Sequence, residues 1–251
     1  MSTRQQAGQA PARHKDPSRL APEHVRKITP YMPGKPISEL AREFGLREQD
    51  IVKLASNENP RGPSPAVRAA VAAAVDELAR YPDGNGFELK AALAKRYGVA
   101  ENQIVLGNGS NDILELVTQA FLLPGDEVVY SQHAFAVYPP PELEAPSAEW
   151  VGRYPHLIVS RTFSKAYGLA ALRLGYGLMH AQVADIMNRV RQPFNVNSLA
   201  QAAAVAALGD TAYVAESRAL NDAGIRQLVE GLDAMGVTHV PSHANFLLVE
   251  V

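Results

Sequence analysis

The fold of this chain is decided by the stretch Ser160-Arg-Thr-Phe-Ser-Lys-Ala-Tyr-Gly-Leu-Ala-Ala-Leu-Arg173-Leu-Gly-Tyr-Gly177. The apolar run before it, 157–160, and the run 174–179 at its end each predict a buried strand. A lysine at the end of a buried strand is costly unless its charge is paired or given up to a covalent bond. Hydroxyls and a guanidinium suit a phosphate. The residues that carry this chemistry are Thr162, Ser164, Lys165 and Arg173.

Together these side chains predict a site that holds a phosphorylated carbonyl compound over an amine. Pyridoxal phosphate has that chemistry, because its aldehyde forms a covalent bond with a lysine amine. The alternative is a turn between two strands with ordinary surface charges. Lys165 taken alone favours the turn, whereas the whole constellation favours the cofactor.

A second glycine-rich turn predicts another wall for the phosphate. It joins a predicted strand, 103–106, to a predicted amphipathic helix and reads Gly107-Asn-Gly-Ser-Asn-Asp112. This arrangement points free backbone N–H groups at an anion. The turn lacks the third glycine and the acidic residue of a dinucleotide fingerprint, which disfavours a nucleotide.

Several separated segments resemble one family. Thr162-Phe-Ser-Lys165 with Gly168–Gly177 resembles the lysine segment of class I and II aminotransferases. Asn57-Glu-Asn-Pro60, Tyr31 and Arg191-Gln-Pro-Phe-Asn-Val-Asn197 are most similar to the histidinol-phosphate aminotransferase branch. The resemblance implies an α/β protein of fold type I, the pyridoxal-phosphate-dependent transferase fold. That fold has three αβα layers around a mostly parallel sheet, shortened here by missing strands, and a small α+β domain that is incomplete here.

The resemblance also implies roles for individual residues. Lys165 is the expected catalytic residue, and Tyr31 and Asn57 are expected on the substrate side. The expected cofactor-binding residues are Gly109, Ser110, Asn111, Phe135, Thr162, Ser164, Lys165, Arg173 and, reaching into the neighbouring subunit of a homodimer, Tyr81. Alternatives stay open for three of them: Asn57 as a turn former, Phe135 as core packing and Tyr81 as a boundary residue.

The sequence departs from the family after Tyr138. Only residues 132–156 lie between Ser131, which follows the predicted strand at 127–130, and Leu157, where the next strand begins, and the family has two further strands in this interval. Those strands carry the asparagine that touches the cofactor oxygen and the aspartate that pairs with its ring nitrogen, and neither motif occurs in this chain. The join Tyr138-Pro-Pro-Pro-Glu-Leu143 therefore indicates a missing block. The small domain is expected to be truncated, without the family's substrate arginine.

These patterns predict four regions. Residues 1–24 are expected to form a disordered tail, and 25–60 an N-terminal arm with part of the small domain. Residues 61–208 are expected to form the cofactor-binding large domain, with the missing segment near 139–141. Residues 209–251 are expected to form the truncated small domain.

Composition narrows the class of protein. The 24 basic and 26 acidic residues give a net charge of −2, which suggests no nucleic-acid or membrane partner. The chain has no cysteine, which rules out disulfides and thiolate chemistry and is compatible with a cytoplasmic location. The histidines have no metal-ligand spacing, and no metal site is expected.

The resemblance implies an enzyme of histidine biosynthesis, with a phosphorylated amine and a 2-oxo acid as partners. The predicted reaction converts L-histidinol phosphate and 2-oxoglutarate into imidazole-acetol phosphate and glutamate. One alternative is an impaired remnant that only binds cofactor and dimerises. Another is a phosphothreonine decarboxylase or a different class I or II aminotransferase.

Overall fold

The computed structural model describes residues 16–130 and 146–250, so the predicted role of Phe135 lies outside the described residues. The chain divides into two compact units, one up to Ala55 and one from Ser56 onward. The predicted boundary near residue 208 stays a prediction. Among the residues described, no helix is long and apolar enough to cross a membrane.

The first unit consists of short helical segments. They are η1 (Pro17–Leu20), α1 (Glu23–Arg26), α2 (Ile37–Phe44) and η2 (Glu48–Asp50). α2 ends at Gly45, whose φ of 65° places it in the left-handed region that glycine tolerates best. Tyr31 belongs to this unit and its side chain is 88% exposed.

The second unit is built on a three-stranded sheet in the order β1-β3-β2. The strands are β1 (Ile104–Gly107), β2 (Val159–Thr162) and β3 (Gly175–Leu178). β3 lies in the middle and runs antiparallel to both neighbours. The expectation of a mostly parallel sheet is therefore wrong for the described strands. β1 and β2 do run in the same direction, but the central strand separates them.

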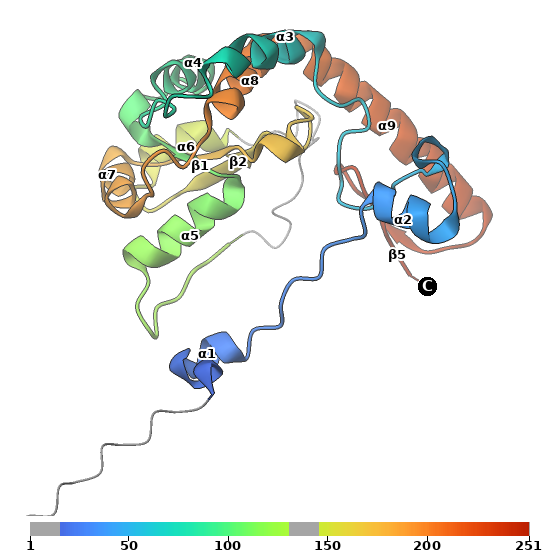
Figure 1. Ribbon diagram of the computed structural model, residues 1–251, viewed down its shortest axis with the longest axis horizontal. Helices are drawn as coiled ribbons and strands as arrows, with labels where there is room; N and C mark the ends of the chain where they lie inside the picture. The colour runs from blue at the N-terminus through green and yellow to red at the C-terminus, as the bar shows by residue number, and fades with distance from the viewer. Residues whose placement is uncertain (1–15, 131–145, 251) are drawn as a thin grey trace, which may run out of the picture. The chain divides into compact units, whose positions relative to one another are not determined.

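Helices cover both faces of this sheet, which confirms the three-layer architecture (Figure 1). One face carries α3 (Pro65–Ala74), α4 (Phe87–Tyr97), α6 (Ser147–Arg153) and α8 (Ser198–Gly209). The other face carries α5 (Ser110–Phe121) and α7 (Ala181–Val190). Two separate apolar clusters result. The alternating side chains of β1 point into both layers, with Ile104 and Leu106 in one cluster and Val105 in the other, whereas the two side chains of β3, Tyr176 and Leu178, both join the first cluster. Short 3-10 turns complete these layers: η3 (Val75–Glu77), η4 (Glu101–Gln103) and η6 (Ala170–Leu172).

Residues 127–130, which the sequence predicts as a strand, form no regular element. Val129 is fully exposed and Tyr130 is 82% exposed. A β-prone segment forms a strand only when it finds a ladder partner, and no described strand pairs with this one.

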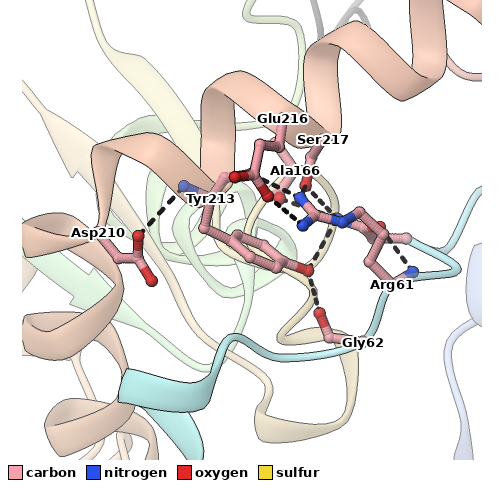
Figure 2. Close-up of polar contacts among 8 residues, drawn as sticks. Arg61, Gly62, Ala166, Asp210, Tyr213, Glu216 and Ser217 are labelled. Carbon is pink, nitrogen blue, oxygen red and sulfur yellow. Dashed lines mark hydrogen bonds and ion pairs between the residues drawn. The ribbon is translucent and has the colours of Figure 1, made fainter.

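The chain continues from the sheet into the long helix α9 (Thr211–Ala234), followed by the short pair β4 (His239–Val240) and β5 (Leu248–Val249). Asp210 caps α9, since its side-chain oxygen accepts a hydrogen bond from the backbone N–H of Tyr213 at 3.1 Å (Figure 2). Only the first turns of α9 bury side chains, namely Tyr213, Val214 and Ser217. The anchoring of α9 thus depends on its N-terminal end.

Replacing Asp210 by alanine is expected to lower the free energy of unfolding by about 1 kcal/mol, because one N–H group of the first turn loses its acceptor. Urea unfolding followed by circular dichroism measures this change. Asp210→Asn keeps the acceptor oxygen and is the matched control. An equal loss in both variants would show that the negative charge, and not the cap, matters.

Candidate active site

Lys165 lies in a tight loop immediately after β2. The loop is fixed by backbone hydrogen bonds from Phe163 N to Leu174 O at 3.0 Å and from Gly168 N to Lys165 O at 2.8 Å. The side chain of Phe163 is fully buried beneath the loop. Backbone hydrogen bonds and core packing therefore fix the position of the Lys165 backbone, while its side chain remains only partly buried.

The amine of Lys165 donates a hydrogen bond to the backbone carbonyl of Ser56 at 2.8 Å. Burial lowers the pKa of Lys165 below its ordinary value; the Glu58 carboxylate opposes this shift, and the positive charge of Arg173 adds to it. A lowered pKa increases the neutral fraction of the amine near pH 7. The neutral amine is the nucleophilic form, so this environment favours attack on a carbonyl carbon.

The N-terminus of α5 forms the opposite wall of the site. Gly109 precedes the helix at φ 87° and gives it no side-chain cap, so the first N–H groups of α5 are available to an anion. Asp112 holds the turn from inside the helix, since its carboxylate accepts from the backbone N–H of Asn108 and from the Asn195 amide, both at 2.8 Å.

Arg173 connects the two walls. Its guanidinium donates to the Ser164 hydroxyl at 3.4 Å and to the Ala170 carbonyl at 3.0 Å. A Cβ atom placed on Gly109 would lie 2.6 Å from the Arg173 guanidinium, so the arginine packs directly over this glycine. A side chain at position 109 would fill this cradle. Guanidinium, hydroxyl and helix N-terminus thus meet at one place, which is a suitable donor set for a phosphate.

Gly175 on β3 makes this close approach possible. A Cβ atom there would lie 2.5 Å from the carbonyl carbon of Gly109 and closer still to the backbone nitrogen of Ser110. Thr162 completes the wall, because its hydroxyl oxygen accepts from the backbone N–H of Ser164 at 3.1 Å.

Two other predicted site residues of the second unit, Tyr81 and Asn57, make contacts outside this cluster. Tyr81 is 84% exposed and stacks on Phe194 with ring centroids 4.9 Å apart. Asn57 has a φ of 51°, and its carbonyl accepts from the Asn245 amide at 2.8 Å. Tyr31 lies in the first unit. Their cofactor and substrate roles stay predictions.

Sequence reasoning missed the residues of segment 59–62 and α9 that support the lysine loop. They are Asn59, Arg61, Tyr213 and Ser217, which form one hydrogen-bonded group. The sequence showed Asn59 as part of the family-like segment Asn57-Glu-Asn-Pro60 and as a turn former, but not as a support of the lysine loop. Apart from the backbone N–H of Arg61, its partners lie more than a hundred positions away, so no local pattern carried that signal.

Comparison with known proteins identifies the family to which this site belongs. The model of the family "Aminotransferase class I and II" matches residues 49–141 and 133–251. The histidinol-phosphate aminotransferase 2 of Nitrosospira multiformis is 46% identical, over 92% of this chain and 79% of its own length. The histidinol-phosphate aminotransferase 1 of Thiobacillus denitrificans is 47% identical, over 92% and 80% respectively.

A solved structure agrees on the fold. The histidinol-phosphate aminotransferase of Sinorhizobium meliloti, in complex with pyridoxal-5'-phosphate, superimposes with a TM-score of 0.73 at 23% identity. The match covers 90% of this chain and 81% of that one. At this identity the likeness shows a shared fold, and the family assignment comes from the closer sequence relatives.

The alignments also locate a difference. The match to the Nitrosospira relative runs over 309 positions, whereas the chain has 251 residues. Because the match covers 92% of the 251 residues, about 231, roughly 78 of its positions have no counterpart in this chain. The family match breaks into two pieces at 133–141, where the sequence predicts a missing block. The family match and these relatives show that the chain belongs to the class I and II aminotransferases, among the histidinol-phosphate aminotransferases.

Proposed function

We propose that this protein transfers the amino group of L-histidinol phosphate to 2-oxoglutarate with pyridoxal phosphate as cofactor, giving imidazole-acetol phosphate and glutamate. One observation carries the proposal. The half-buried amine of Lys165 lies in the same loop as Ser164 and Arg173, which meet Gly109 at the N-terminus of α5. The named activity of the relatives at 46–47% identity supports the choice of substrate.

The residues present fit the phosphate and the aldehyde of the cofactor. Arg173, the Ser164 hydroxyl and the backbone N–H groups of Ser110 and Asn111 would hold the phosphate. Thr162 would add a hydroxyl, and Phe135 would stack on the ring. When bound, pyridoxal phosphate supplies an electron sink for the carbon that loses its proton.

Lys165 has two tasks in this proposal. Its neutral amine, which the lowered pKa favours, would condense with the cofactor aldehyde and release water. When substrate has displaced it, the free amine would accept a proton at Nζ and deliver it two atoms away, which is the 1,3-transfer that the reaction requires. The Ser56 carbonyl, 2.8 Å from Nζ, orients the amine in the meantime.

Further roles belong to the same proposal. Tyr81, which is exposed and stacks on Phe194, would reach the cofactor phosphate of a neighbouring subunit in a homodimer whose sites lie between subunits. Tyr31 and Asn57 would contact the substrate. The absence of cysteine is compatible with the cytoplasm as the location.

A second candidate function is a module that binds cofactor and dimerises without turnover. The observation that favours it is the deficit of roughly 78 aligned positions relative to the Nitrosospira protein. The family's ring-nitrogen aspartate belongs to that stretch. Losing one such transition-state interaction typically costs about 10²–10³ in rate.

A coupled assay separates the two candidates. Purified protein with pyridoxal phosphate, L-histidinol phosphate and 2-oxoglutarate is expected to produce glutamate in proportion to imidazole-acetol phosphate. L-Threonine O-phosphate, tested in parallel for released carbon dioxide, examines the decarboxylase alternative. Cofactor capture without glutamate formation would overturn the transaminase proposal and support the binding module.

A further inference from the structure

The segment 59–62 supports the lysine loop at two points. The side-chain amide of Asn59 donates to the carbonyl of Ala166, the residue directly after Lys165, at 3.0 Å. Gly168 packs so closely on this segment that a Cβ atom there would lie 2.8 Å from the carbonyl carbon of Gly62. These two contacts hold the loop at Ala166 and Gly168, which follow the lysine by one and three residues.

The hydrogen-bonding capacity of Asn59 is fully used. Its carbonyl oxygen accepts from the backbone N–H of Arg61 at 3.0 Å, which fixes the orientation of the amide. Its amide nitrogen donates to the Ala166 carbonyl and to the Ser217 hydroxyl, the latter at 3.2 Å, and the Tyr213 hydroxyl lies at 3.4 Å as a longer alternative acceptor. Aspartate at this position would lose the amide donors, and alanine would lose the acceptor as well.

The long helix α9 fixes Asn59 in turn. Arg61 donates to the Tyr213 carbonyl at 3.0 Å and to the Ser217 hydroxyl at 3.1 Å, and pairs with Glu216 (Figure 2). The guanidinium also lies 4.5 Å from the centre of the Tyr213 ring, whose hydroxyl donates to the Gly62 carbonyl. Tyr213 is 8% and Ser217 3% exposed, so the bonds at these two residues are shielded from competing water, whereas the pair with Glu216 is exposed.

We propose that Asn59 is a positioning residue for Lys165, which holds the loop so that the amine stays partly buried and aimed at the cofactor carbonyl. This inference rests on the proposed function and deepens it. Asn59 itself touches neither cofactor nor reacting atoms. It acts through the Ala166 carbonyl, because a shift of that peptide moves the lysine backbone next to it.

The consequence is measurable without cofactor. Burial is the largest cause of the lowered pKa of Lys165, while Glu58 and Arg173 are the charged groups that face its amine. Releasing the loop exposes the amine and removes part of that burial. The pKa of Lys165 then rises toward the ordinary lysine value, and its neutral fraction at pH 7–8 falls.

The test compares Asn59→Ala with Asn221→Ala in the full chain. Asn221 lies in α9, and its side-chain amide likewise donates a hydrogen bond to a backbone carbonyl, that of Ala244, at 3.2 Å. Lys165 acetylation by acetic anhydride is followed against pH by peptide mass spectrometry. A second measurement records the rate at which pyridoxal phosphate is captured at Lys165, with borohydride quenching. Thermal unfolding of each variant reports general stability.

The expected result is an upward shift of the acetylation midpoint and about tenfold slower capture in Asn59→Ala only. Ser217→Ala, which removes one acceptor of Asn59 and leaves the Ala166 bond, is expected to show a smaller shift in the same direction. It also replaces Asn59→Ala as the deciding variant if the latter does not fold.

An unchanged midpoint in these variants, or the same shift in Asn221→Ala, would overturn the positioning role. Failure of the proposed function has a different signature, since the wild-type protein would then capture no pyridoxal phosphate. The acetylation midpoints would still decide the role of Asn59 in that case.

Discussion

Replacing Lys165 by alanine is expected to reduce amino transfer by about 10⁴-fold, because one side chain supplies both the nucleophile and the proton transfer. The groups proposed to bind the phosphate, at Arg173, Ser164 and the start of α5, remain in place in this variant. Pyridoxal phosphate is therefore expected to bind without a covalent bond and to be washed out by dialysis. Glutamate formation and cofactor retention measure the two effects.

Two control variants test whether the loss is specific to the amine of Lys165. Lys165→Arg keeps a positive charge at the position but cannot form the covalent bond, and the same loss is expected. Lys95→Ala removes an exposed lysine of α4 and is expected to behave as wild type. Full activity in Lys165→Ala would show that another amine carries the reaction.

Gly175→Ala is expected to have the second largest effect. The added methyl group would meet backbone atoms on two sides, the start of α5 and the Arg161 carbonyl at 2.9 Å. Backbone cannot move aside as a side-chain end does, so β3 and α5 must separate. We expect a loss of about 3 kcal/mol in unfolding free energy and weaker binding of the cofactor phosphate.

Gly177→Ala is the matched control on the same strand. There the added methyl group would meet the terminal methyl of Met179 at 2.6 Å and a methyl of Ile113 at 3.0 Å. The methionine end is flexible and can turn away. Urea unfolding and phosphate competition against pyridoxal phosphate compare the two variants. Equal effects at both glycines would contradict a specific role for the approach of β3 to α5.

The local parts of the site could be predicted from the sequence. A β-branched run that ends in Thr162–Lys165, and a strand followed by Gly107–Asp112 and an amphipathic helix, are patterns of neighbouring residues. Because such patterns depend on short-range sterics and helix termini, the structure reproduces both. Residue type and resemblance predicted Arg173 near the start of α5, where it packs over Gly109; its role as a phosphate ligand stays a prediction.

The remainder depends on tertiary contacts that leave no local trace. The order β1-β3-β2 is set by which strands are available as neighbours, so the antiparallel centre was missed. Likewise, the 127–130 segment has strand propensity but no described pairing partner. Asn59 reaches Ala166 across 107 positions, and only the folded chain brings them together.

The most direct test of the central claim is to locate the cofactor adduct. The full-length protein is incubated with pyridoxal phosphate, reduced with borohydride, digested and analysed by mass spectrometry. The account predicts a reduced phosphopyridoxyl group on the peptide that contains Lys165, and its loss when Arg173 and Ser164 are both replaced by alanine. An adduct confined to other lysines, or no adduct, would contradict it.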